Sequence, residues 1–124
     1  MGKSLLLDTD ILIDWLQGRR WARNLLTQTD LVFYYSTVTH KELLSKPGLS
    51  SSERRIIVSL LRRLRWIPIS PEIADKSFDL LKRYSKKGLT KNDAIIAATA
   101  WSKNLLLFTR NRRHFQFIEE IRLL

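Results

Sequence analysis

Three acidic side chains of this sequence stand where a binding or reacting centre is expected. Asp8 directly follows the apolar run 5–7, and Glu42 and Asp93 each lie near the start of a segment with helical patterning. A short apolar run without alternation is typical of a buried parallel strand, and ligands of open α/β sheets bind beyond the carboxyl ends of such strands. If the flanking strands are neighbours, the three carboxylates converge on one cleft. Converging carboxylates raise one another's pKa unless a cation lies among them, and a small hard ion, Mg²⁺ or Mn²⁺, suits oxygen ligands.

Helix capping is the competing explanation for these acids. Glu42 and Asp93 each follow a threonine by three residues, which matches or approximates the capping box that closes a helix N-terminus. Acids in the first turn of a helix also interact favourably with the helix dipole. Asp8 is harder to explain in this way, because an acid that ends a strand caps a helix only if the helix begins at once, and Asp10 suits that N-cap position better.

The elements that must position these acids alternate between strand and helix. Apolar and β-branched runs predict strands at 5–7, 31–35, 66–69, 105–108 and 121–124, and Pro68 indicates that the third is an edge strand. Helical periodicity and capping residues predict helices at 11–16, 20–26, 36–44, 50–64, 71–88 and 90–101. Strands that alternate with helices imply a parallel sheet with right-handed crossovers, so the fold class is α/β.

Composition excludes several classes of protein. The chain has 124 residues, of which 44% are hydrophobic, so we expect one domain over residues 1–124 with a real core. It has no cysteine, which excludes a disulfide framework and removes the thiolate ligands of most structural zinc sites. No apolar run approaches the roughly 18 residues of a membrane span, and the N-terminus does not resemble a signal peptide. We therefore expect a cytoplasmic protein that makes no use of a membrane.

Net charge is more informative than composition. The chain carries 22 Lys and Arg against 12 Asp and Glu, a formal charge of +10. Such an excess attracts polyanions such as nucleic acid, anionic lipid surfaces or an acidic protein partner. The basic residues cluster at 19–23, 54–65, 82–91 and 110–113. The arginine-rich segment 54–65 is either a solvated helix face or a contact surface for RNA or a partner.

Four segments resemble, in order, the four signature motifs of PIN-domain ribonucleases. They are LLLDTDILID at 5–14, VTHKELL at 38–44, NDAIIAATA at 92–100 and LFTRNRRHF at 107–115. The likeness is closest to the VapC toxins of bacterial and archaeal toxin–antitoxin pairs, and it covers essentially the whole chain. Each motif alone is weak, and the specificity comes from four motifs in order at plausible spacing.

The resemblance implies both a fold and a reaction. The fold is a three-layer α/β/α sandwich with a central parallel sheet of four to five strands, and the reaction is Mg²⁺-dependent endonucleolytic cleavage of RNA, with tRNA or rRNA as the substrate. The motif acids that hold the metal correspond to Asp8, Glu42 and Asp93, and Thr109 is expected to orient a ligand or a water. The family further implies a homodimer and an antitoxin protein that places a basic residue in the acidic site.

The last motif departs from the family pattern. Many members have an aspartate two residues after the threonine, and this chain has Asn111 there, with His114 where related sequences that carry this Asn have an aspartate. Asn111 is neutral and still able to coordinate or orient water, so we expect one well-held metal and a second that is weak or arrives with substrate. Thr9 and Asp10 are expected to surround the ligands, with Asp10 restoring negative charge.

Two other interpretations stay open. Asn111 favours a catalytically decayed PIN-like module that binds RNA or a partner, whereas the retention of all three motif acids favours an active nuclease. An Asp-x-Asp after a strand also opens phosphoaspartyl phosphatases of the haloacid-dehalogenase type, but Leu12 stands where those enzymes usually have threonine. Near the last motif, we expect Arg110, Arg112 and Arg113 to contact RNA. We expect His40 to lie on the surface.

Overall fold

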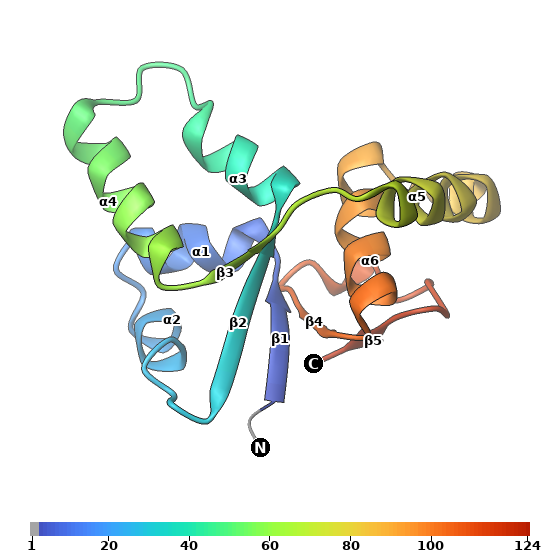
Figure 1. Ribbon diagram of the computed structural model, residues 1–124, viewed down its shortest axis with the longest axis horizontal. Helices are drawn as coiled ribbons and strands as arrows, with labels where there is room; N and C mark the ends of the chain where they lie inside the picture. Colours follow the sequence, from blue (N-terminus) through green and yellow to red (C-terminus); the bar gives the residue numbers. More distant parts are fainter. Residues whose placement is uncertain (1–2) are drawn as a thin grey trace.

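The centre of the structure is a parallel sheet with the strand order β3-β2-β1-β4-β5 (Figure 1). The computed structural model describes residues 3–124. In this range the strands are β1 (Lys3–Leu7), β2 (Leu31–Ser36), β3 (Arg65–Ile67), β4 (Leu106–Phe108) and β5 (Arg122–Leu123). All of the strand pairings are parallel, and β3 is an edge strand, so both predictions are confirmed. β3 ends at Ile67, two residues before the predicted end, because Pro68 has no N–H to continue the ladder.

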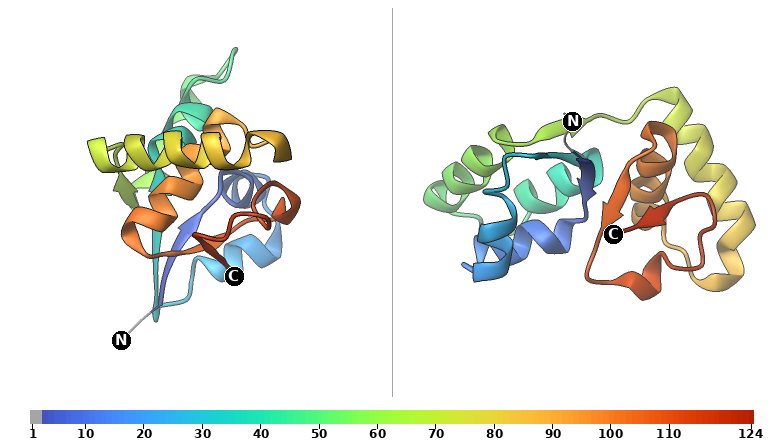
Figure 2. Two further views of the ribbon diagram at one scale, coloured as in Figure 1. Left: turned by 90° about the vertical axis from the view of Figure 1, so that its right-hand side faces the viewer. Right: turned by 90° about the horizontal axis from the view of Figure 1, so that it is seen from below.

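Helices cover both faces of the sheet. They are α1 (Thr9–Leu16), α2 (Arg20–Leu25), α3 (Thr37–Leu44), α4 (Ser51–Arg62), α5 (Pro71–Tyr84) and α6 (Lys91–Lys103), with short 3-10 turns η1 (Ser85–Lys87) and η2 (Arg112–His114). Figures 1 and 2 show α1, α2 and α4 on one side of the sheet and α5 and α6 on the other. The predicted α/β/α sandwich is therefore confirmed. None of the helices in residues 3–124 is long and apolar enough to cross a membrane.

The sheet separates two apolar cores. Leu5 and Leu7 pack with α1 and α4, whereas Leu6 faces the opposite core under α5 and α6. All three side chains are fully buried, because successive residues of a strand point to opposite faces and both faces are covered. Helix α3 lies at the end of the sheet and contributes Val38 to one core and Leu43 to the other. The carboxyl edge of the sheet is thereby held between two packed layers.

Two helix starts differ from the prediction. Helix α1 begins directly after β1, so Asp8 itself is the N-cap and accepts a hydrogen bond from the backbone N–H of Thr9; the assignment of Asp10 as the cap was wrong. Helix α3 is capped by Ser36, whose hydroxyl accepts from the N–H of Thr39. Glu42 therefore lies in the second turn of α3 and is not part of a capping box.

Other helix starts agree with the sequence. The hydroxyl of Ser50 and the side chain of Glu53 form the predicted capping box of α4. Ser70 caps α5, with Pro71 at the first helical position. Thr90 accepts a hydrogen bond from the N–H of Asp93 and caps α6, as its spacing predicted. Because that cap is satisfied by the backbone of Asp93, the carboxylate of Asp93 remains available for another partner.

Candidate active site

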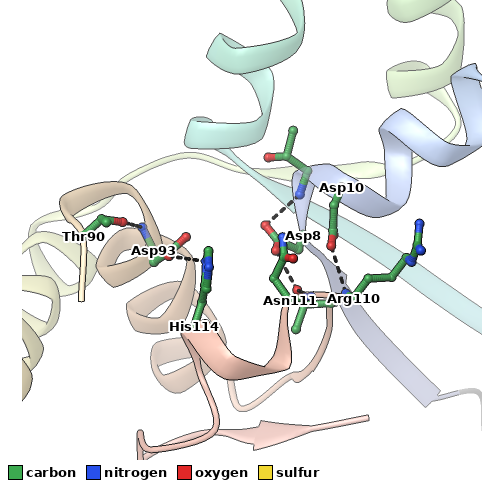
Figure 3. A network of polar contacts seen from close by, with 9 residues as sticks. Asp8, Asp10, Thr90, Asp93, Arg110, Asn111 and His114 are labelled. Atoms are coloured by element: carbon green, nitrogen blue, oxygen red, sulfur yellow. Dashed lines mark hydrogen bonds and ion pairs between the residues drawn. The ribbon is translucent and has the colours of Figure 1, made fainter. Parts of the chain in front are cut away.

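The carboxyl edge of the sheet collects the residues singled out by the sequence. β1 lies between β2 and β4, so the segments that leave these three strands start side by side. Asp8 follows β1, Glu42 comes from the helix after β2, and Thr109 and Asn111 follow β4. Asp93 comes from the first turn of α6, and Figure 3 shows it across from Asp8 at the same edge. The topology thus supplies the site from segments that are far apart in sequence.

Asp8 is the buried carboxylate of the group. It is 7% exposed, and it accepts hydrogen bonds from the Thr9 N–H at 2.8 Å and from the Thr109 hydroxyl at 2.7 Å. Its pKa is raised to about 6, chiefly by burial and also by the negative charges of Asp10 and Asp93, against the lowering effect of the two hydrogen bonds. Burial disfavours the charged form of a carboxyl group, and neighbouring acids add to that effect.

Thr9 connects the acid after β1 to the acid on α3. Its backbone donates to Asp8, while its hydroxyl donates to Oε1 of Glu42 at 2.9 Å and lies 2.9 Å from the hydroxyl of Thr39. Both threonines are buried, whereas Glu42 is exposed. Thr39, which the sequence indicated as a helix cap, instead supports Thr9. The buried hydroxyl pair holds the exposed carboxylate of Glu42 beside the first turn of α1.

Asp93 is paired with a histidine from the last motif. Nδ1 of His114 lies 3.2 Å from Oδ2 of Asp93, and Figure 3 shows the imidazole turned toward the carboxylate. The Asp93 side chain is 19% exposed and that of His114 is 58% exposed. The family resemblance placed an aspartate at the position of His114. The substitution exchanges an acid for a hydrogen-bonding or cationic partner of Asp93.

Thr109 fixes the loop after β4. Its hydroxyl donates to Asp8 and accepts from the backbone N–H of Asn111 at 3.0 Å. Thr109 is buried, and Asn111 is exposed at the rim of the site. A single hydroxyl therefore sets the position of Asn111 relative to the buried carboxylate.

Arg110 has structural partners that the sequence did not indicate. Its backbone N–H donates to Oδ2 of Asp10 at 2.9 Å, and its guanidinium donates to Oδ2 of the buried Asp14 at 2.5 Å. The guanidinium carbon also lies 5.9 Å from the centre of the Trp21 ring. Contact between the Arg110 guanidinium and RNA, as predicted, would compete with its contacts to Asp14 and Trp21. Asp14 was missed, although its place one helical turn after Asp10 puts both acids on one face of α1.

The other predicted basic and aromatic positions differ in their surroundings. Arg112 donates to the backbone carbonyl of Leu124 at 2.7 Å, and Arg113 is exposed. His40 was expected on the surface, and this was wrong: it is half-buried and its ring stacks on Trp66 with the ring centres 4.6 Å apart. Trp66 lies on the edge strand β3, and its indole N–H donates to the hydroxyl of Thr37, the first residue of α3. Nothing in the sequence near His40 signals this long-range contact.

The donor chemistry of the edge fits a hard divalent cation. Asp8, Glu42, Asp93 and Asp10 offer carboxylate oxygens, the ligands that Mg²⁺ and Mn²⁺ prefer. Oδ1 of Asp10 is buried without a hydrogen-bond partner, and burial raises the pKa of this carboxyl. Over residues 3–124 no three acidic or histidine side chains lie close enough to hold one ion in their present rotamers. One carboxylate oxygen of Glu42 is engaged by Thr9, and one of Asp93 by His114.

Comparison with known proteins identifies the family. The model of the PIN domain matches residues 5–120. The chain belongs to the PIN-domain family. It is 34% identical over 122 residues to Ribonuclease VapC10 of Mycobacterium tuberculosis, which covers 95% of this chain and 90% of that protein. It is also 29% identical over 119 residues to Ribonuclease VapC1 of Methanocaldococcus jannaschii, covering 94% of this chain and 82% of the relative.

Solved structures agree with this assignment. A chain of a toxin–antitoxin complex from Klebsiella pneumoniae matches this PIN domain with a TM-score of 0.79 and 35% identity, over 94% of each chain. A chain of VapBC2 from Rickettsia felis, solved bound to a DNA fragment from its promoter, matches with a TM-score of 0.85 and 24% identity, over 98% of this chain and 97% of that one. The family predicted from the four motifs is therefore confirmed.

Replacing Asp8 by Asn tests the electrostatics of the site in the absence of metal. The folded-state pKa of about 6 lies above the reference value of 3.8, so the folded PIN domain binds more protons between these values and loses stability as pH rises through them. This shift corresponds to about 3 kcal/mol, and the lost hydrogen bond from Thr109 offsets about 1 kcal/mol of it. We expect Asp8→Asn in EDTA to raise the free energy of unfolding by about 2 kcal/mol at pH 7.5, with a smaller gain at pH 5. Urea unfolding across this pH range measures it, and a gain independent of pH contradicts it.

Replacing Arg110 by Ala tests whether this side chain is structural. The change leaves the buried carboxylate of Asp14 without its donor, so we expect the free energy of unfolding to fall by about 1–3 kcal/mol. Arg113→Ala is the matched control because it removes the same charge from an exposed position of the same loop. Urea unfolding measures both variants. Equal losses in the two variants would show that the Asp14 contact contributes nothing.

Proposed function

We propose that this PIN domain is a metal-dependent endoribonuclease that cleaves phosphodiester bonds of RNA. The observation that carries the proposal is the buried, hydrogen-bonded Asp8 with its raised pKa, at an edge that Asp93 shares and that Thr9 connects to Glu42. Carboxylate oxygens gathered at one edge suit a hard cation. Relatives that match the chain over nearly its whole length carry the name ribonuclease, which supports RNA as the substrate class.

The residues of the site have different roles in the proposed reaction. Asp8, Glu42 and Asp93 would hold Mg²⁺, with Mn²⁺ as a substitute. When bound, the ion supplies an activated water and stabilises charge on the phosphoryl and leaving oxygens. Thr109 orients Asp8 through its hydroxyl. Thr109 also fixes the backbone of Asn111, whose amide is placed at the rim to orient a water or a phosphate oxygen.

The proposed substrate is tRNA or rRNA, cut in a single-stranded or loop segment. The backbone of such a segment bends into a cleft more readily than a duplex does. The formal charge of +10 attracts RNA at long range, and salt weakens this attraction. A protein that acts on tRNA or rRNA works where these molecules are, so we propose the cytoplasm as its location.

An antitoxin protein is the proposed regulator. Solved chains similar to this PIN domain come from toxin–antitoxin complexes. An apolar groove of about 410 Å³ lies between α1, α3 and α4, with Ile13 and Ile56 exposed along it and Glu42 at its border. We propose that apolar side chains of the antitoxin occupy this groove. A basic side chain from the same segment then reaches Glu42 and neutralises the acidic edge, which removes the attraction for the cation.

Homodimer formation is a further part of the proposal, based on the family resemblance. Each chain has a mass of 14.6 kDa, so a dimer has twice that mass. We expect light scattering coupled to size-exclusion chromatography to give the dimer mass for the free PIN domain. A mass of one chain at the working concentration of the cleavage assay would contradict a dimeric active form.

Replacing Asp93 by Asn tests the proposed cleavage. The change removes one metal ligand without touching the basic surface, so we expect the cleavage rate to fall at least about 100-fold while RNA binding stays largely unchanged. The assay compares a mixed tRNA and rRNA pool with Mg²⁺, Mn²⁺ or EDTA, and reads discrete cut sites. Asp79→Asn, an exposed acid on α5, is the matched control.

Each outcome of this assay separates the candidate functions. Metal-dependent cutting at discrete sites that is lost in Asp93→Asn supports the nuclease. Absence of cutting by folded, metal-saturated protein that still binds RNA favours the decayed module, the alternative that Asn111 and the separated acids support. Cutting that persists in EDTA contradicts metal dependence.

A further inference from the structure

The outer face of α4 carries an arginine-lined groove that the proposed cleavage does not use. The groove has a volume of about 390 Å³, and we call it the α4 arginine groove; its lining residues are Ser51, Arg54, Arg55, Val58, Ser59 and Arg62. These positions recur at intervals of three and four residues, which places them on one side of the helix. The opposite side of α4 buries Ile57, Leu60 and Leu61 in the core, so the groove faces outward.

The charge of this groove is not neutralised by the protein. None of the ion pairs within residues 3–124 includes Arg54, Arg55 or Arg62. By contrast, Arg83 is paired with Glu120 and Arg110 with Asp14. The one acid of α4, Glu53, is engaged by the backbone of Ser50 and by Lys46 at the start of the helix. Like charges on one helix face repel one another, and a bound anion would relieve this repulsion.

We infer that the α4 arginine groove is a second RNA-binding surface, which holds the phosphate backbone of a structured RNA away from the cleavage centre. This inference rests on the proposed function in taking RNA as the ligand. Guanidinium groups bind phosphate oxygens in bidentate fashion, and the hydroxyls of Ser51 and Ser59 are further donors of the kind that contact phosphates. Arg54 and Arg62 are eight residues apart, about 12 Å along the helix axis, so they reach different phosphates.

The composition of the groove favours RNA over an acidic protein. Val58 is the one apolar side chain in its lining, whereas protein–protein interfaces are anchored by buried apolar and aromatic groups. The apolar groove between α1, α3 and α4 has that character and lies on another side of the same helix. The two surfaces of α4 therefore suit two different partners. The two grooves share no lining residue, so both can be occupied at once.

The location of the groove fits a substrate larger than the cleavage centre. Figure 1 shows α4 as the outermost helix on its side of the sheet, joined by a loop to α3, which carries Glu42. A folded RNA that contacts α4 has to pass α3 to reach the acidic edge. The groove is therefore expected to contribute affinity for structured RNA, and to leave the chemical step at the acidic edge unchanged.

The test compares two triple variants with the same change in charge. The groove variant is Arg54→Gln, Arg55→Gln and Arg62→Gln. The control is Lys82→Gln, Lys86→Gln and Lys87→Gln, three exposed residues of α5 and η1 on the other side of the sheet. Binding of a fluorescein-labelled tRNA transcript is measured by fluorescence anisotropy in EDTA over a range of NaCl concentrations. Circular dichroism confirms that each variant is folded.

We expect the groove variant to raise Kd at least about tenfold at low salt and to reduce the slope of log Kd against log salt by about 2, since each phosphate contact contributes about 0.7–0.9 to that slope. The control is expected to change Kd only slightly. In cleavage assays with Mg²⁺, the groove variant should raise KM for tRNA and leave kcat unchanged. Equal effects of the two triple variants, or no effect of the groove variant, would overturn the inference.

The binding assay separates this inference from the proposed function. Selective loss of RNA binding in the groove variant supports the groove even if the wild-type PIN domain cuts no RNA. If the groove variant cleaves tRNA with an unchanged KM and kcat, the proposed nuclease function stands and the inference about the groove is overturned. Unchanged RNA binding together with lost binding of polyglutamate would assign the groove to an acidic protein and overturn RNA as its ligand.

Discussion

The burial of one carboxylate at the junction of β1 and α1 organises the candidate site. Asp8 ends a central strand, caps the following helix and accepts the hydroxyl of Thr109 from the loop after β4. The hydroxyl of Thr109 in turn accepts a hydrogen bond from the backbone N–H of Asn111. The hydroxyl of Thr9 donates a hydrogen bond to the carboxylate of Glu42. A buried carboxylate is stable only when it is hydrogen-bonded. The same contacts that make Asp8 tolerable in the core therefore align three of the four motifs.

Local patterns were sufficient to predict the sheet and the acids at its edge. The run at 5–7, the cap and box residues of α4, α5 and α6, and the proline after β3 each act over a few residues, and the structure has these elements where they indicated. The N-cap of α1 was misassigned because the choice between Asp8 and Asp10 depends on whether the chain enters the helix directly from the strand. The contacts of Arg110 with Asp14 and of His40 with Trp66 join residues far apart in the sequence, and no local pattern encodes them.

The departures of the last motif from the family pattern change the charge around the site. Asn111 removes a negative charge, and His114 replaces another acid with a partner that lies against Asp93. Asp10 and Asp14 add two carboxylates on α1, but Arg110 engages both, through its backbone and its guanidinium. Neither Asp8 nor Glu42 forms an ion pair within residues 3–124, and burial has raised the pKa of Asp8. Under the proposed function, these two carboxylates are the ones that a cation would reach without displacing a basic side chain.

An acidic centre in a protein of charge +10 solves a physical problem of nucleases. Carboxylates that hold a metal repel the phosphates they act on, so attraction has to come from other parts of the surface. Long-range attraction follows the net charge, whereas the geometry of cleavage is set within a few ångströms of the ion. Placing arginines on the outward face of α4 and acids at the carboxyl edge of the sheet separates these two requirements. Substitutions among the arginines of α4 then leave the hydrogen bonds around the acids undisturbed.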